Sequence, residues 1–130
     1  MGMQEKRATS EFQANDFPGL QARINELAGH RVSIEVEWNE LAEPDYGHMY
    51  KEGWTKIFFT PLVDALVQLT RDVIGKDAVR HGLRAIRLRS SGYNSVVLAD
   101  GTLTIDQRFS NFNSIDERTT AVLRALEAGL

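Results

Sequence analysis

The feature that most constrains this chain is an Asp100-Gly101 pair between two short runs of alternating apolar and polar residues. Asp-Gly favours the left-handed backbone angles of a type I′ turn, whose twist matches that of two antiparallel strands. A two-residue turn places four apolar side chains on one face of a hairpin, in the pairs Leu98–Leu103 and Val96–Ile105. That register allows one face of the hairpin to be buried. The sequence therefore predicts two antiparallel strands on either side of this turn.

Two further segments, 31–38 and 84–90, also alternate between apolar and polar residues. Each predicts a strand with one buried face and one polar face. Strands of parallel sheets are usually apolar on both faces, whereas an antiparallel sheet often keeps one face in water. We therefore expect an antiparallel sheet of about four strands, with the last three strands forming a meander.

Apolar residues recur at helical spacing in segments 17–28 and 61–74, and residues 76–81 add one or two more helical turns. A last helix begins at Ser114, where Ser114 and Glu117 have the spacing of a capping box. Residues 54–59 fit either a short strand or a helix. The expected order is α-β-α-α-β-β-β-α. Helices on the apolar face of the sheet then give a two-layer α+β domain.

Residues 1–15 are polar and lack periodicity, so we interpret them as an N-terminal arm whose order the sequence leaves open. Residues 16–130 contain no interdomain linker and no internal repeat. Their length is that of one domain. We expect a single α+β domain over 16–130.

Residues 39–53 are expected to form a long irregular loop, and loops of this length are often functional. The candidate binding residues in and next to it are acidic, aromatic or histidine: Glu40, Glu43, Asp45, Tyr46, His48, Tyr50 and Trp54. Aromatic side chains interleaved with charges are typical of interface hot spots. The three acids have no obvious partner within the chain. We therefore expect the 39–54 loop to form the functional surface, with Glu43, Asp45, Tyr46, His48 and Tyr50 exposed and Trp54 more readily explained as part of the core.

Four arginines form an alternative site for an anion: Arg80, Arg84, Arg87 and Arg89. Alternation places Arg87 and Arg89 on the polar face of the sheet, so we expect at least one of them to pair with Glu35 or Glu37 on a neighbouring strand. The chain has 15 Lys and Arg against 18 Asp and Glu. This acidic balance, and the absence of aromatic residues among the arginines, argue against a nucleic-acid partner.

The common catalytic and cofactor motifs are absent, and the chain has no cysteine, so we predict no cofactor and no metal. No apolar run is long enough for a signal peptide or a membrane span. We expect a small non-enzymatic cytoplasmic protein that binds another macromolecule, most simply a protein, as an adaptor, chaperone or immunity-type domain. The alternative is a small enzyme or metal- or ligand-binding domain with its site in the 39–54 loop, where Asp45 and His48 could act together.

Overall fold

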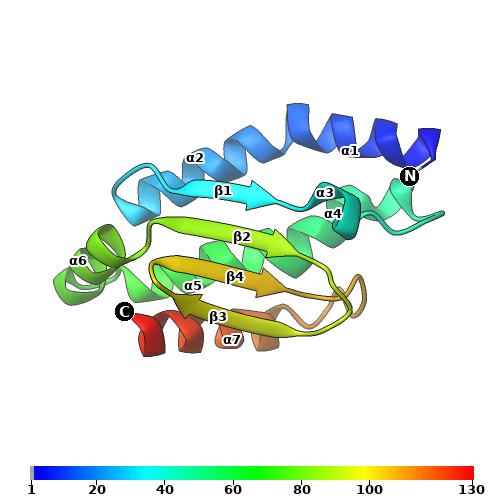
Figure 1. The fold of residues 1–130 in the computed structure, drawn as a ribbon. Helices are drawn as coiled ribbons and strands as arrows, with labels where there is room; N and C mark the ends of the chain where they lie inside the picture. Colours follow the sequence, from blue (N-terminus) through cyan, green and yellow to red (C-terminus); the bar gives the residue numbers. More distant parts are fainter. Residues whose placement is uncertain (1) are drawn as a thin grey trace.

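A four-stranded sheet forms one layer of the fold, and helices lie against one of its faces (Figure 1). The computed structural model describes residues 2–130. The strands are β1 (Ser33–Val36), β2 (Ala85–Arg89), β3 (Ser95–Ala99) and β4 (Thr102–Asp106). Their spatial order is β1-β2-β4-β3. The prediction of a single α+β domain with a four-stranded sheet is confirmed.

The expectation of a purely antiparallel sheet is wrong, because the sheet is mixed and mostly parallel. β1 pairs in parallel with β2, β2 pairs in parallel with β4, and only β3 and β4 are antiparallel. β4 therefore lies between β2 and β3, and no meander forms. Helices cover only one face of the sheet (Figure 1), so even its parallel strands keep a polar face, and alternation could not distinguish the two kinds of pairing.

The hairpin of β3 and β4 is confirmed in its predicted register. Val96 lies opposite Ile105 and Leu98 lies opposite Leu103. Asp100 and Gly101 have φ angles of 53° and 79°, as a type I′ turn requires. Three of the four paired side chains are buried, and Val96 is partly buried. Local turn chemistry therefore determines this part of the fold.

The N-terminal segment is helical rather than a loose arm, and the expected order of elements lacked this helix. α1 (Met3–Asn15) precedes α2 (Phe17–Ala28), whose bounds agree with the predicted helix. Residue 1 of the predicted arm lies outside the described residues. Phe12 is buried on the inner side of α1 against Trp54 and Phe59, so a single aromatic side chain anchors a mostly polar helix.

Most of the segment expected to be an irregular loop is helical. It contains α3 (Trp38–Leu41), the 3₁₀ helix η1 (Gly47–Met49) and α4 (Tyr50–Trp54). A π-helical turn, η2 (Thr55–Phe59), leads into α5 (Thr60–Leu69).

The helix that runs through α4, η2 and α5 settles the ambiguity of residues 54–59, which are not a strand. The chain is already helical from Tyr50, so α5 continues that helix, whereas the sequence predicted a separate helix over 61–74. Pro61 lies just after the π-helical turn, whose wider bonding pattern fits a residue that has no N–H to donate. Phe59 and Leu62, on either side of Pro61, are buried, so core packing stabilises the continuous helix.

The remaining helices are α6 (Val73–Gly82) and α7 (Ile115–Gly129). The predicted helix over 61–74 ends early, because Asp72 caps a new helix by accepting the Gly75 N–H at 2.7 Å. The expected capping box at Ser114 is wrong, since its side chain makes no capping hydrogen bond. Within residues 2–130, no helix is both long enough and apolar enough to cross a membrane.

An inner aromatic cluster lies in the core between the N-terminal helices and the helices that follow β1. Its members are Phe12, Phe17, Trp38, Tyr50, Trp54 and Phe59, whose rings contact one another mostly edge to face. These rings come from five helical elements, so the cluster joins α1 and α2 to the helices that follow β1. Through Tyr50, whose ring meets that of Phe109 edge-on at 6.0 Å, the cluster also contacts the loop that follows β4.

Candidate functional site

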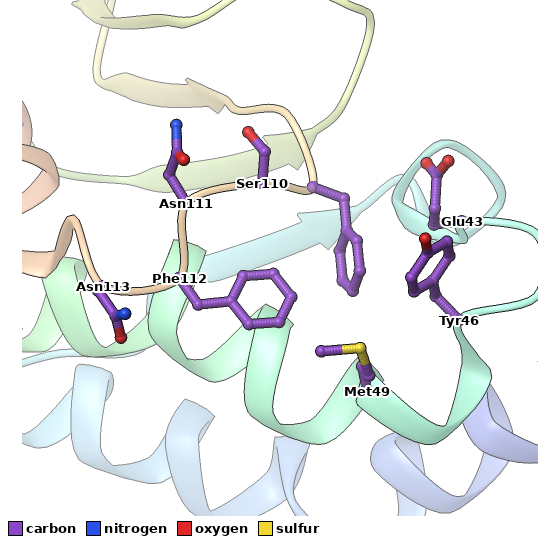
Figure 2. A pocket seen from close by; sticks show the side chains of 8 residues that line it. Glu43, Tyr46, Met49, Ser110, Asn111, Phe112 and Asn113 are labelled. Carbon is purple, nitrogen blue, oxygen red and sulfur yellow. The ribbon is translucent and has the colours of Figure 1, made fainter.

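A surface cavity of about 470 Å³ lies between residues 43–49 and the loop that follows β4 (Figure 2). We call it the aromatic notch. Its lining residues are Glu43, Tyr46, Met49, Phe109, Ser110, Asn111, Phe112 and Asn113. The two walls are distant in sequence, so the notch exists only in the folded chain.

The phenylalanines of the notch lie directly against the backbone of α4. Phe109 and Phe112 meet edge to face, with ring centroids 5.0 Å apart. A Cβ atom at Gly53 would lie only 2.5 Å from Phe109 Cε2 and 2.9 Å from Phe112 Cζ. Gly53 therefore provides the space in which both rings dock, and the loop after β4 acquires a defined position on the helix.

Arg118 of α7 anchors the same loop through hydrogen bonds to its backbone carbonyl groups. Its Nη1 donates to the Asn111 carbonyl at 3.0 Å, and its Nη2 donates to the Ser110 carbonyl at 2.8 Å. The side chain is largely buried, and this burial lowers the pKa of the Arg118 guanidinium. Among the described residues Arg118 has no ion pair, and its Nε is buried without a hydrogen-bond partner. The two bonds to carbonyl groups therefore offset only part of the cost of burying this charge, and they fix the loop backbone on this wall.

Hydrogen bonds to the backbone fix the opposite wall. The Tyr50 hydroxyl donates to the Glu43 carbonyl at 2.7 Å, and the Asp45 N–H donates to Glu5 Oε1 at 3.1 Å. This second bond lowers the pKa of the Glu5 carboxyl. Burial raises the pKa of Tyr50, and the charges of Glu5 and Glu43 add to that effect. Both walls of the notch are thus held in place before any ligand arrives.

The structure divides the predicted site residues between surface and core. Glu43, Asp45, Tyr46 and His48 are exposed, as expected, and two of them line the notch. Tyr50 and Trp54 are 1% and 0% exposed, so the expectation that Tyr50 lies on the surface is wrong. Trp54 stacks on Tyr50 with ring centroids 4.4 Å apart and donates its indole N–H to the Leu41 carbonyl at 3.1 Å.

His48 faces a neighbouring depression, which it shares with residues of α4 and η2. Its ring stacks on Tyr46 at a centroid distance of 6.3 Å. Among residues 2–130, no hydrogen bond joins His48 to Asp45. No group of three or more histidine, aspartate or glutamate side chains in that range is placed to hold a metal ion.

Ion pairs engage the arginines that the sequence places on the sheet. Arg87 pairs with Glu37 at 3.1 Å, which confirms the predicted pairing between neighbouring strands. Arg89 donates to both oxygens of Glu40, at 3.2 and 3.1 Å. These hydrogen bonds raise the pKa of Arg89. The expectation that Glu40 has no internal partner is therefore wrong.

The two other arginines of the alternative anion site lie apart from this pair. Arg84 donates to the Asp100 carbonyl at 3.3 Å, beside the hairpin turn. Arg80 lines a separate depression at the C-terminal end of α2. The four arginines therefore do not form one continuous basic site.

Sequence reasoning missed one wall of the notch. Neither Phe109 nor Phe112, in the loop after β4, is among the candidate residues predicted from the sequence. Two phenylalanines in a short polar loop were the available signal, because such rings require something to pack against. Comparisons with protein-family models, curated proteins and solved structures found no match. The functional inference therefore depends on the geometry of the notch.

Proposed function

We propose that this chain is a small, non-enzymatic protein-binding domain, and that a segment of the partner docks in the aromatic notch. The observation that carries the proposal is the hollow of about 470 Å³ with aromatic walls. Tyr46 is exposed, and Phe109 and Phe112 are half-buried. Aromatic side chains at the centre of an interface commonly contribute much of its binding energy.

The rim of the notch supports binding of a peptide segment. Ser110, Asn111 and Asn113 are exposed, and their hydroxyl and amide groups can both donate and accept hydrogen bonds. An extended peptide presents the same two kinds of group along its backbone. A polar rim around an apolar centre is the usual arrangement of a protein interface.

The rigidity of both walls also supports the proposal. Arg118 holds the Ser110 and Asn111 carbonyls on one side, and the Tyr50 hydroxyl holds the Glu43 carbonyl on the other. A site that is already ordered loses less conformational entropy when a partner binds. The notch therefore has the preorganisation that affinity for a short segment requires.

Selection from a phage-displayed library of random peptides tests the proposal with the purified full chain. The test variant combines Glu43→Gln with Tyr46→Ala at the notch. The matched control combines Val73→Ala with Ile74→Ala, which truncates two apolar side chains that are 72% and 82% exposed. They begin α6, at the opposite end of the molecule from α4 (Figure 1).

We expect the selected peptides to bind the parent and the α6 control equally and to lose binding to the notch variant. Circular dichroism and thermal unfolding of the three proteins would establish that each is folded. Peptides that bind the notch variant as tightly as the parent, or a library that yields no binder, would contradict the proposal.

A further inference from the structure

We infer that the notch receives a basic side chain of the partner, arginine in preference to lysine. This inference rests on the proposed function and adds the chemistry of the docked residue. It follows from the charge of one wall, the aromatic character of the hollow, and the engagement of nearby cations elsewhere.

The first observation is a free carboxylate at the notch. Within residues 2–130, the Glu43 side chain has no hydrogen bond and no ion pair, although its backbone carbonyl accepts the Tyr50 hydroxyl. Glu37 and Glu40, which precede it in the chain, are both paired with arginines of β2. Glu43 is exposed and lines the hollow, so it is available to a cation that comes from outside the chain.

The second observation is the set of rings beside that carboxylate. Tyr46 and Phe109 have centroids 6.2 Å apart, and Phe112 lies edge-on to Phe109. Aromatic faces attract cations, and the flat guanidinium of arginine also stacks on them. Met49 lines the same hollow and offers an apolar, adaptable surface for the aliphatic stem of a basic side chain.

The third observation is that Arg118, Arg108 and Lys51, the cations close in sequence to the notch walls or bonded to them, have partners within the chain. Arg118 is 9% exposed and directs its Nη atoms to loop carbonyls. Arg108 donates its Nε–H to the Gly92 carbonyl at 2.7 Å. Lys51 pairs with Asp16 at 3.6 Å. Among the described residues that line the notch, Glu43 is the only charged one, and a basic side chain is complementary to it.

Titration by ¹H–¹⁵N NMR with small probes tests the inference on the full chain. The probes are N-acetyl-arginine methylamide and its neutral isostere, N-acetyl-citrulline methylamide, with N-acetyl-lysine and N-acetyl-aspartate methylamides for comparison. We expect shifts confined to residues 43–49 and 109–113. Arginine should bind about five- to tenfold more tightly than citrulline, and this preference should fall as ionic strength rises.

Two charge-removing variants locate the effect. Glu43→Gln removes the carboxylate that attracts the guanidinium, so the preference for arginine over citrulline should fall to about twofold or less. The change is only a few-fold because exposed ion pairs contribute little binding free energy. Glu11→Gln is the matched control, because it removes one exposed carboxylate from α1 at a residue that does not line the notch. The control should keep the preference of the parent.

Three results would overturn the inference. Equal binding of arginine and citrulline would show that the notch does not select for positive charge. Stronger binding of the aspartate probe would show that it prefers negative charge. The absence of shifts at the notch with every probe would also reject a basic ligand. The phage selection judges the proposed function independently, since it can succeed with neutral peptides.

Discussion

Two groups of aromatic rings meet at Tyr50, and they differ in what covers them. On one side, the inner aromatic cluster is enclosed by α1, and Trp54 and Phe12 are fully buried. On the other side, Tyr46 is 46% exposed and Phe109 is half-buried in the notch. Tyr50 contacts both groups, stacking on Trp54 at 4.4 Å and meeting Phe109 edge-on at 6.0 Å. The same residue types thus stabilise the fold in one place and remain accessible in the other.

The largest expected effect tests whether the buried rings stabilise the fold, and it follows from removing one ring of the inner aromatic cluster. Trp54→Ala should lower the free energy of unfolding by about 3–5 kcal/mol, as large-to-small changes at buried aromatic sites do. Urea denaturation measures this loss. Trp54→Phe keeps a ring but removes the indole N–H that reaches the Leu41 carbonyl, so it should cost less. A loss below about 1 kcal/mol for Trp54→Ala would mean that the inner aromatic cluster contributes little to the free energy of unfolding.

A change at Gly53 should disturb the notch while leaving its lining residues intact. An added Cβ would collide with the rings of Phe109 and Phe112. Overpacking costs about 1–3 kcal/mol, and replacing glycine by alanine in a helix returns about 1 kcal/mol. Gly53→Ala should therefore destabilise the chain by up to about 2 kcal/mol and abolish binding of peptides selected for the notch.

Gly19→Ala in α2 is the matched control, because nothing lies within 4 Å of the added atom. It should leave stability unchanged or raise it by about 0.5–1 kcal/mol. Equal stability and equal peptide binding in both alanine variants would show that the close approach at Gly53 is not needed.

Tyr50 connects the two groups, and its hydroxyl gives a smaller and pH-dependent effect. Tyr50→Phe removes the bond to the Glu43 carbonyl and should cost about 1 kcal/mol at neutral pH. Because the pKa of Tyr50 is raised in the fold, its contribution is complete below the unfolded-state pKa of about 10. The contribution is lost as pH rises through the folded pKa.

Stability curves for the parent and for Tyr50→Phe, measured from neutral to alkaline pH, check this expectation. The parent should lose more stability than the variant in the alkaline range. Tyr93→Phe is the control. The Tyr93 side chain is exposed, so removal of its hydroxyl should leave the dependence of stability on alkaline pH as it is in the parent. Identical alkaline slopes for the parent and Tyr50→Phe would refute the assignment.

The smallest expected effect on stability is at the notch itself. Tyr46→Ala should change the free energy of unfolding by less than about 0.5 kcal/mol, as is usual at exposed sites. The same variant should lose most of its affinity for notch-binding peptides, measured by calorimetry. A Tyr46→Ala chain that unfolds would place Tyr46 with the structural rings, and the distinction between the two groups would disappear.

Several features follow from sequence because their causes are local. The Asp100-Gly101 turn dictated the register of the β3–β4 hairpin, and Gly29, with a φ of 77°, ends α2 where the sequence predicts. Alternation along β1 and β2 also predicted the ion pair between Glu37 and Arg87. In each case neighbouring residues carry the whole physical reason, whether turn geometry or side-chain direction.

Part of the site could be predicted in the same way. Glu43 and Tyr46 were candidates because charges and aromatic rings gather in that segment, and both line the notch. Tyr50 and Trp54 were candidates for the same reason, yet they are buried. Composition alone does not distinguish the two pairs, because burial depends on α1, whose only buried aromatic side chain is Phe12.

By itself, the sequence determined the hairpin, the two other strands, the helix 17–28 and the α+β class. Only the tertiary structure decided that β4 lies between β2 and β3, that the helix runs through Pro61, and that the loop after β4 docks on Gly53. These three outcomes depend on contacts between segments that are distant in the chain. Their free energy comes from shared burial, which no short window of sequence contains.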